Sequence, residues 1–252
     1  MIAIVGHPIL AIDAAGPRLT GLTAAIASTA ATAGAAVQVI GKVGEDPDGD
    51  AVLLALARAG VGHVATLRDP AHRTLVIRSA PLPGSSTGAD SADSTVGPDA
   101  SGAKAGSGLF DDELPDDDID PWWVPQAALE PLDPADRPGL DPADVELALR
   151  YLPDVSAVVV VEPVPGLASS CATEAAAAGA HLIVIAGPGP DEAAELGGLP
   201  DGTLILSAPD GPDPAAFASV VGRYAALVDA GTDPARAFEA VLAEQAAERA
   251  AP

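Results

Sequence analysis

The sequence predicts an α/β fold with a mostly parallel central sheet, and two observations carry this prediction. Short apolar runs rich in β-branched residues, such as the valine-rich residues 155–161, are typical of strands buried on both faces of a parallel sheet. Segments with helical character separate these runs along the chain. That alternation is the order of elements found in α/β proteins.

The first part of the chain, residues 1 to about 80, alternates strand and helix signals. Gly34 and Gly60 each follow a segment with helical character, and glycine suits the C-terminal end of a helix. Residues 41–49 are rich in turn-forming residues. We therefore expect strands at residues 2–5, 37–40, 63–67 and 74–78, and helices at residues 23–32 and 51–59.

The last part, from residue 140 to the end, shows the same alternation. Three of its helices begin with an Asp-Pro pair, in which the aspartate suits the cap and proline suits the first helical position. These pairs are Asp141-Pro142, Asp213-Pro214 and Asp233-Pro234. We expect helices at residues 145–152, 168–178, 215–229 and 235–249, and strands at residues 155–161, 181–186 and 203–206.

Residues 81–139 differ in composition from both of these parts. Ser, Gly, Asp, Ala and Pro dominate, and an acidic cluster occupies residues 111–120. Such a segment buries too little apolar area to offset the entropy lost on ordering it. We therefore interpret residues 81–139 as a long disordered acidic insertion, and residues 1–80 and 140–252 as two parts of one α/β domain.

Both tryptophans of the chain, Trp122 and Trp123, lie in this insertion. Two interpretations are open. The pair packs on the surface of the domain and anchors the loop, or it forms a short motif that a protein partner binds.

The charge of the chain argues against two classes of partner. Lys and Arg number 12 and Asp and Glu 36, so the net charge is −24. A chain of this charge repels nucleic-acid phosphates and anionic lipid heads, so we expect neither nucleic acid nor a membrane as a partner. The start of the chain lacks the basic and apolar regions of a signal peptide, which favours a cytoplasmic location.

Candidate metal ligands are sparse. The single cysteine, Cys171, lies among small residues of an expected helix and is interpreted as a small core residue. The four histidines His7, His63, His72 and His181 lack the paired spacing of a metal site, so we expect no bound metal there.

Two segments carry a resemblance to a known family. Residues 36–49 read AVQVIGKVGEDPDG, and a predicted helix ending in Gly60-Val61 follows them. Residues 216–238 form the second segment. Together they resemble the PfkB/ribokinase family of carbohydrate kinases. The resemblance implies a ribokinase-like three-layer sandwich that binds Mg-ATP and a sugar or nucleoside alcohol.

In this family an aspartate in a Gly-Ala-Gly-Asp turn accepts the proton of the attacking hydroxyl, and the backbone amides of that turn bind the phosphate. Aligning on residues 216–217 places Ala215 at the position of this aspartate, and a methyl group cannot accept a proton. Pro214 removes one amide donor from the turn. Asp213 is then a helix cap that occupies the anion position, or a displaced catalytic base. Asp210 is a second candidate for a displaced acid.

The resemblance also implies a sugar site near the start of the chain. It places Gly21 in the family's glycine pair, and Ala25 where the family has an asparagine. Asp13 either corresponds to the aspartate that binds substrate hydroxyls or is a solvated loop acid.

Two functions follow. The sequence favours a kinase-like protein without efficient phosphotransfer, which binds a small metabolite or a protein partner. The alternative is an active ATP-dependent sugar or nucleoside kinase that uses Asp210 or Asp213.

Overall fold

The computed structural model describes residues 1–13, 16–78, 138–163, 165–187, 196, 198–208 and 214–250. Its central sheet has six strands in the order β5-β4-β1-β7-β8-β9, and every neighbouring pair is parallel. The strands are β1 (Ile2–Val5), β4 (Val37–Gly44), β5 (Thr66–Asp69), β7 (Ala157–Val160), β8 (His181–Ala186) and β9 (Leu204–Ser207). The predicted α/β class with a mostly parallel sheet is confirmed.

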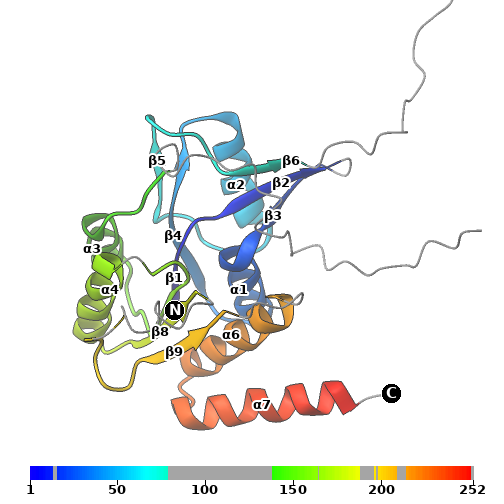
Figure 1. Ribbon diagram of the computed structural model, residues 1–252, viewed down its shortest axis with the longest axis vertical. Coiled ribbons are helices and arrows are strands. Elements are labelled where there is room, and N and C mark those ends of the chain that lie inside the picture. Colours follow the sequence, from blue (N-terminus) through cyan, green and yellow to red (C-terminus); the bar gives the residue numbers. More distant parts are fainter. Residues whose placement is uncertain are drawn as a thin grey trace, which may run out of the picture. The chain divides into compact units, whose positions relative to one another are not determined.

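Helices cover both faces of this sheet and make three layers (Figure 1). One face packs against α1 (Gly21–Thr32), α2 (Pro47–Arg58) and α6 (Pro214–Asp229), with α7 (Pro234–Ala250) against α6. The other face packs against α3 (Pro142–Tyr151) and α4 (Pro165–Ala178). Alternate side chains of β1 belong to the two cores: Ile2 and Ile4 face α1, whereas Ala3 and Val5 face the α3 side. Burial on both faces explains the continuous apolar runs.

The expected helix caps form where the structure describes them. At the start of α3, the Asp141 carboxylate accepts a hydrogen bond from the Asp144 amide, and the Asp144 carboxylate accepts one from the Asp141 amide, both at 3.0 Å. This reciprocal pair satisfies two amides that lack partners within the helix.

A second sheet was not predicted from the sequence. It has three strands in the order β3-β2-β6, namely β2 (Ile9–Asp13), β3 (Gly16–Thr20) and β6 (Val76–Arg78). Only β6 overlaps an expected strand, and β3 contains Pro17. Because β3 is an edge strand of this sheet, the missing amide of Pro17 is tolerated there.

Two strands differ from their predictions by three residues or more at one end. β4 continues four residues past Ile40, through Gly41 to Gly44, although these residues have turn-forming character. A methyl group at Gly41 would lie 2.7 Å from the Gly6 carbonyl oxygen and 2.8 Å from Pro8 Cδ. Gly41 is thus needed for this close approach of the chain between β1 and β2. β5 begins at Thr66, three residues later than expected.

Several predictions fall outside the described residues. They concern most of the acidic insertion at residues 81–139, its tryptophans Trp122 and Trp123, and the aspartates Asp210 and Asp213. The disorder of the insertion and the three-part division of the chain stay predictions. In the described ranges, no helix is both long enough and apolar enough to cross a membrane.

Candidate functional site

The carboxyl ends of all six strands of the central sheet lie along one edge, because the strands are parallel. From β1 the chain passes to β4 on one side of it, and later returns to β7 on the other side. The gap between the ends of β1 and β7 is therefore a topological switch point. In open α/β sheets, ligands bind in the crevice that opens at such a point.

Two titratable side chains meet at this switch point. His7 lies two residues after the end of β1, and Glu162 lies two residues after the end of β7. Val5 and Val160 are partners in the sheet register, so the two side chains emerge at the same level. His7 Nδ1 lies 2.6 Å from Glu162 Oε2, and His7 Nε2 bonds the carbonyl oxygen of Pro138. The histidine side chain is 16% exposed and the glutamate side chain 48%, so only the carboxylate is open to a ligand.

Gly6 lets the first turn of α1 approach this point. A methyl group at Gly6 would lie 2.6 Å from Thr23 Oγ1 and 3.2 Å from Val161 Cβ. Thr23 is itself buried in α1. The helix and the ends of β1 and β7 are thus packed too closely for any residue except glycine.

Gly44, Glu45 and Asp46 form a turn within the segment that carries the family resemblance, and the Asp46 side chain connects several parts of the fold. The Asp46 carboxylate accepts hydrogen bonds from the Gly49 amide at 2.7 Å, the Thr74 amide at 2.9 Å and the Thr74 hydroxyl at 2.7 Å. The Thr74 hydroxyl oxygen accepts from the Gly44 amide at 2.9 Å. Asp46 thereby caps α2 and joins the end of β4 to the segment before β6.

Burial of Asp46 raises the pKa of its carboxyl group, but the hydrogen bonds from Thr74 and Gly49 outweigh this effect and lower the pKa below its ordinary value of 3.8. All three hydrogen bonds favour the ionised form. We conclude that Asp46 is committed to the fold rather than open to a ligand.

Lys42 and Asp144 form a second fully engaged pair at the same edge. Their Nζ and Oδ2 atoms are 2.5 Å apart, and the side chains are 16% and 19% exposed. Asp144 also belongs to the capping box of α3. This ion pair ties β4 to the first turn of α3.

The structure places the predicted substrate residues Asp13 and Gly21 on neighbouring elements. Asp13 ends β2, where its Oδ2 accepts a hydrogen bond from Arg18 Nε at 3.1 Å across the β2–β3 pair. Gly21 begins α1 with a φ of +84°, and a methyl group there would approach Ile9 Cδ1 to 3.0 Å. Their assignment to a substrate site stays a prediction.

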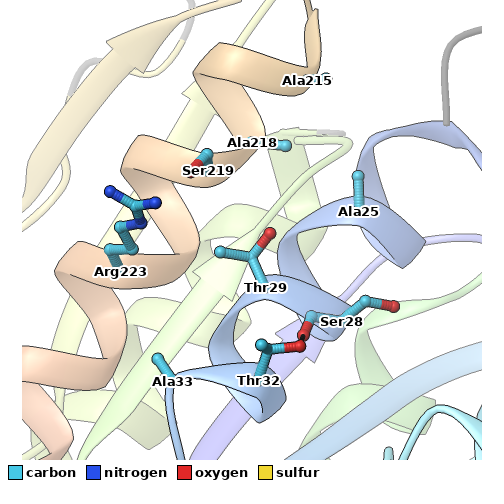
Figure 2. Close-up of a pocket in the computed structure, with 9 residues that line it drawn as sticks. All are labelled: Ala25, Ser28, Thr29, Thr32, Ala33, Ala215, Ala218, Ser219 and Arg223. Atoms are coloured by element: carbon cyan, nitrogen blue, oxygen red, sulfur yellow. Dashed lines mark hydrogen bonds between the residues drawn. The ribbon is translucent and has the colours of Figure 1, made fainter. Parts of the chain in front are cut away.

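Ala25 and Ala215, the two positions where the resemblance expects an asparagine and the catalytic aspartate, lie together in the structure. Both line one groove of about 410 Å³ between α1 and α6 (Figure 2). The close packing of these helices depends on Gly222, where a methyl group would lie 2.7 Å from Thr29 Cβ and 2.9 Å from the Ile26 carbonyl oxygen. The tertiary structure thus brings the two expected site positions together, and both side chains are methyl groups.

The rest of this groove is lined by small side chains and one arginine. Hydroxyls come from Ser28, Thr29, Thr32 and Ser219, and methyl groups come from Ala33 and Ala218. Arg223 lies at the far end from Ala215 (Figure 2) and pairs with Glu244 at 3.1 Å and Glu248 at 2.8 Å, both on α7. Because two carboxylates already neutralise this guanidinium, it is poorly suited to hold a phosphate group.

Metal chemistry finds little support among the residues that the structure describes. There, no group of three or more His, Cys, Asp or Glu side chains could hold a metal ion. Cys171 is fully buried in α4, and burial raises the pKa of its thiol to about 12. A thiol in that environment is unreactive.

Sequence reasoning missed the His7–Glu162 pair because the two residues are 155 positions apart. A usable signal existed: Glu162 lies two residues after a fully buried valine-rich strand, at the end where parallel sheets bind ligands. The partner on the adjacent strand could not be chosen without the strand order.

The described geometry defines a class of protein: a three-layer α/β sandwich with a candidate small-molecule site at the carboxyl ends of its central strands. Comparison with solved structures gives this class a more specific fold. A protein assigned as ribokinase II in E. coli, in its apo form, is 13% identical, with 95% of this chain and 90% of that chain covered and a TM-score of 0.56. The same protein in complex with ATP and Mg²⁺ is 14% identical, with 95% and 89% covered and a TM-score of 0.52.

A protein assigned as a ribokinase in Agrobacterium tumefaciens is 16% identical, with 94% and 87% covered and a TM-score of 0.50. No family model and no curated protein matches the sequence. The chain therefore has a ribokinase-like fold, as the resemblance implied.

Proposed function

We propose that this chain binds a small hydroxylated metabolite, of the sugar or nucleoside class, at the carboxyl edge of its central sheet, and that it lacks efficient phosphotransfer. The observation that carries the proposal is the first turn of α6, which contains Pro214 and Ala215 and no acidic residue. Without a carboxylate there, the attacking hydroxyl has no proton acceptor. Such an acceptor typically contributes about 10²–10⁴ in rate.

Three features support metabolite binding. The fold has a switch point of the kind that binds small molecules, and the half-exposed carboxylate of Glu162 lies at it. Carboxylates accept hydrogen bonds from the hydroxyls of sugars and ribosides. The E. coli protein of similar fold holds ATP and Mg²⁺, so Mg-ATP is the nucleotide to test on this chain.

The alternative proposal is an active ATP-dependent kinase that uses Asp213 or Asp210. Asp213 directly precedes the first residue of α6, and phosphoryl transfer depends largely on positioning of the reactants. A protein partner at Trp122 and Trp123, and a cytoplasmic location, stay proposals from the sequence.

Ligand-dependent thermal stability separates the two functions. A ligand present at 100 times its Kd stabilises the native state by about 2.7 kcal/mol. We expect a neutral sugar or nucleoside to raise the melting temperature without sugar-dependent release of ADP from Mg-ATP. Turnover at the usual kinase rates of about 1–100 s⁻¹, abolished by Asp213→Asn or Asp210→Asn, would overturn the proposal.

Restoring the acid tests the role of position 215 directly. We expect Ala215→Asp to raise sugar-dependent ADP release at least about tenfold above the unmodified chain, provided that the nucleotide binds. Ala216→Asp is the matched control, because it adds the same charge to the same helical turn at a position to which the resemblance gives no catalytic role. Equal activity in the two variants would mean that the added charge alone, and not its position, matters.

A further inference from the structure

The imidazole of His7 is held at both of its ring nitrogens. Nδ1 contacts Glu162 Oε2 at 2.6 Å, and Nε2 contacts the carbonyl oxygen of Pro138. A carbonyl oxygen can only accept, so Nε2 carries a hydrogen and donates it. The ring therefore cannot rotate or flip without losing a hydrogen bond.

The contact between Nδ1 and Oε2 then requires one more proton. With Nε2 protonated, the hydrogen between Nδ1 and Oε2 makes the pair an imidazolium and a carboxylate, or a neutral histidine and a carboxylic acid. In both forms the pair has no net charge. It offers no positive field to a phosphate group, and the net charge of −24 on the chain opposes anions further.

One oxygen of Glu162 remains for a ligand. His7 engages Oε2, whereas Oε1 has no hydrogen-bond partner within the described part of the chain. The side chain is half-exposed at the switch point, where the fold places ligands. A carboxylate fixed through one oxygen presents the other in a defined direction.

We propose that His7 is a positioning residue that orients the Glu162 carboxylate to accept a ligand hydroxyl, and that the site prefers neutral sugars or nucleosides to their phosphorylated forms. This inference rests on the proposed function. It adds His7 as the residue that orients the Glu162 carboxylate, and a preference, based on charge, for the neutral form of a ligand over its phosphorylated form.

The probes are three matched pairs: D-ribose and D-ribose 5-phosphate, D-fructose and D-fructose 6-phosphate, and adenosine and AMP. Calorimetric titration of the full chain should give at least tenfold tighter binding of a neutral member than of its phosphorylated partner. His7→Ala and Glu162→Gln should each lower the affinity for the neutral member of a pair at least tenfold. His7→Asn should remain within about threefold of the unmodified chain, because the Asn amide can donate to Oε2 from near the Nδ1 position.

His72→Ala is the matched control. His72 also bonds a carboxylate, that of Asp69 at 2.8 Å, but it follows β5 at the end of the sheet, away from the switch point. This variant should bind the neutral probe with unchanged affinity. Circular dichroism of each variant separates loss of binding from loss of fold.

A second readout needs no ligand. Ring ¹⁵N spectra should show a different Nδ1 signal for His7 in Glu162→Gln than in the unmodified chain, because an uncharged amide then replaces the carboxylate that contacts this nitrogen. An unchanged Nδ1 signal would overturn the pairing on which the inference rests.

The two proposals fail separately. If a neutral probe binds and His7→Ala binds it equally well, the positioning role is wrong and the proposed function stands. If the phosphorylated member binds more tightly, the selection for neutral ligands is wrong. If none of the six probes binds while the His7 Nδ1 signal responds to Glu162→Gln, the pair exists but the proposed function fails, and the ligand role of His7 fails with it.

Discussion

The groove between α1 and α6, here called the seam, and the switch point between β1 and β7 differ in chemistry. The seam holds the positions that the resemblance assigns to catalysis and sugar binding, and both are alanines. The switch point holds a histidine and a half-exposed carboxylate. The comparison teaches that a fold can keep the positions that a resemblance assigns to a site while the side chains able to form polar contacts with a ligand lie elsewhere.

The largest effect is expected at a charged residue that belongs to neither region. Asp46→Ala removes a helix cap and two hydrogen bonds from Thr74, and we expect it to lower the free energy of unfolding by about 3 kcal/mol. Urea denaturation at pH 7 measures this loss. Asp46→Asn keeps an acceptor oxygen, so it should lower the free energy of unfolding by less than Asp46→Ala does.

The same residue gives a pH signature. Because the folded pKa of Asp46 is lowered, its contribution is present above the ordinary value of 3.8 and is lost as the pH falls through the folded value. The difference between the unmodified chain and Asp46→Ala should therefore narrow in acid. A constant difference down to strong acid would mean that the ionised form is not what the hydrogen bonds favour.

The packing of α1 against α6 at the seam is expected to be sensitive to any increase in side-chain volume. Gly222→Ala places a methyl group against Thr29 Cβ and the Ile26 carbonyl oxygen, and the carbonyl belongs to a helix backbone that cannot rotate away. We expect a net loss of about 1–2 kcal/mol, since the better helix propensity of alanine offsets part of the crowding. Thermal unfolding measures it. A gain in stability would mean that α1 and α6 are free to separate.

A moderate effect is expected at the opposite edge of the sheet, where the Tyr224 hydroxyl and His181 Nε2 lie 2.7 Å apart. Burial lowers the pKa of His181 below its ordinary value of 6.5. The unfolded chain then binds more protons than the folded chain in this range, so stability falls as the pH drops through about 6.5.

Denaturation at pH 7.5 and 5.5 should show the lower stability in acid that His181 causes. Tyr224→Phe should lower the free energy of unfolding by about 1 kcal/mol at pH 7.5. His181→Asn is the control. The fall should shrink in that variant, because its side chain does not titrate. An equal fall in both chains would assign the pH dependence to other groups.

The smallest effect is expected at the groove wall. Ser219→Ala removes a hydroxyl that lines the seam, and we expect a change in stability within about 0.5 kcal/mol and no change in the affinity for a neutral sugar. A tenfold loss of affinity would move the binding site from the switch point to the seam and reverse the comparison.

The antiparallel strands β2 and β3 show why part of the fold was not predictable. Residues 9–13 and 16–20 include Pro17 and are too short and mixed to carry a strand pattern on their own. Their pairing, and the place of β3 at the edge of its sheet, make the proline harmless. In β2 and β3, tertiary contacts outweigh the weak strand propensity of the local sequence. The valine-rich sequence of β7, in contrast, suits only a strand buried on both faces of a sheet.

The sequence by itself determined the alternation of elements and the helix caps at Asp141 and Asp233, because these depend on side chains close together in the chain. The tertiary structure decided which distant residues meet. Strand order placed His7 beside Glu162, and the packing of α1 on α6 placed Ala25 and Ala215 on the same groove. Strand order and helix packing depend on contacts across the whole core. For that reason a local pattern of residues cannot specify them.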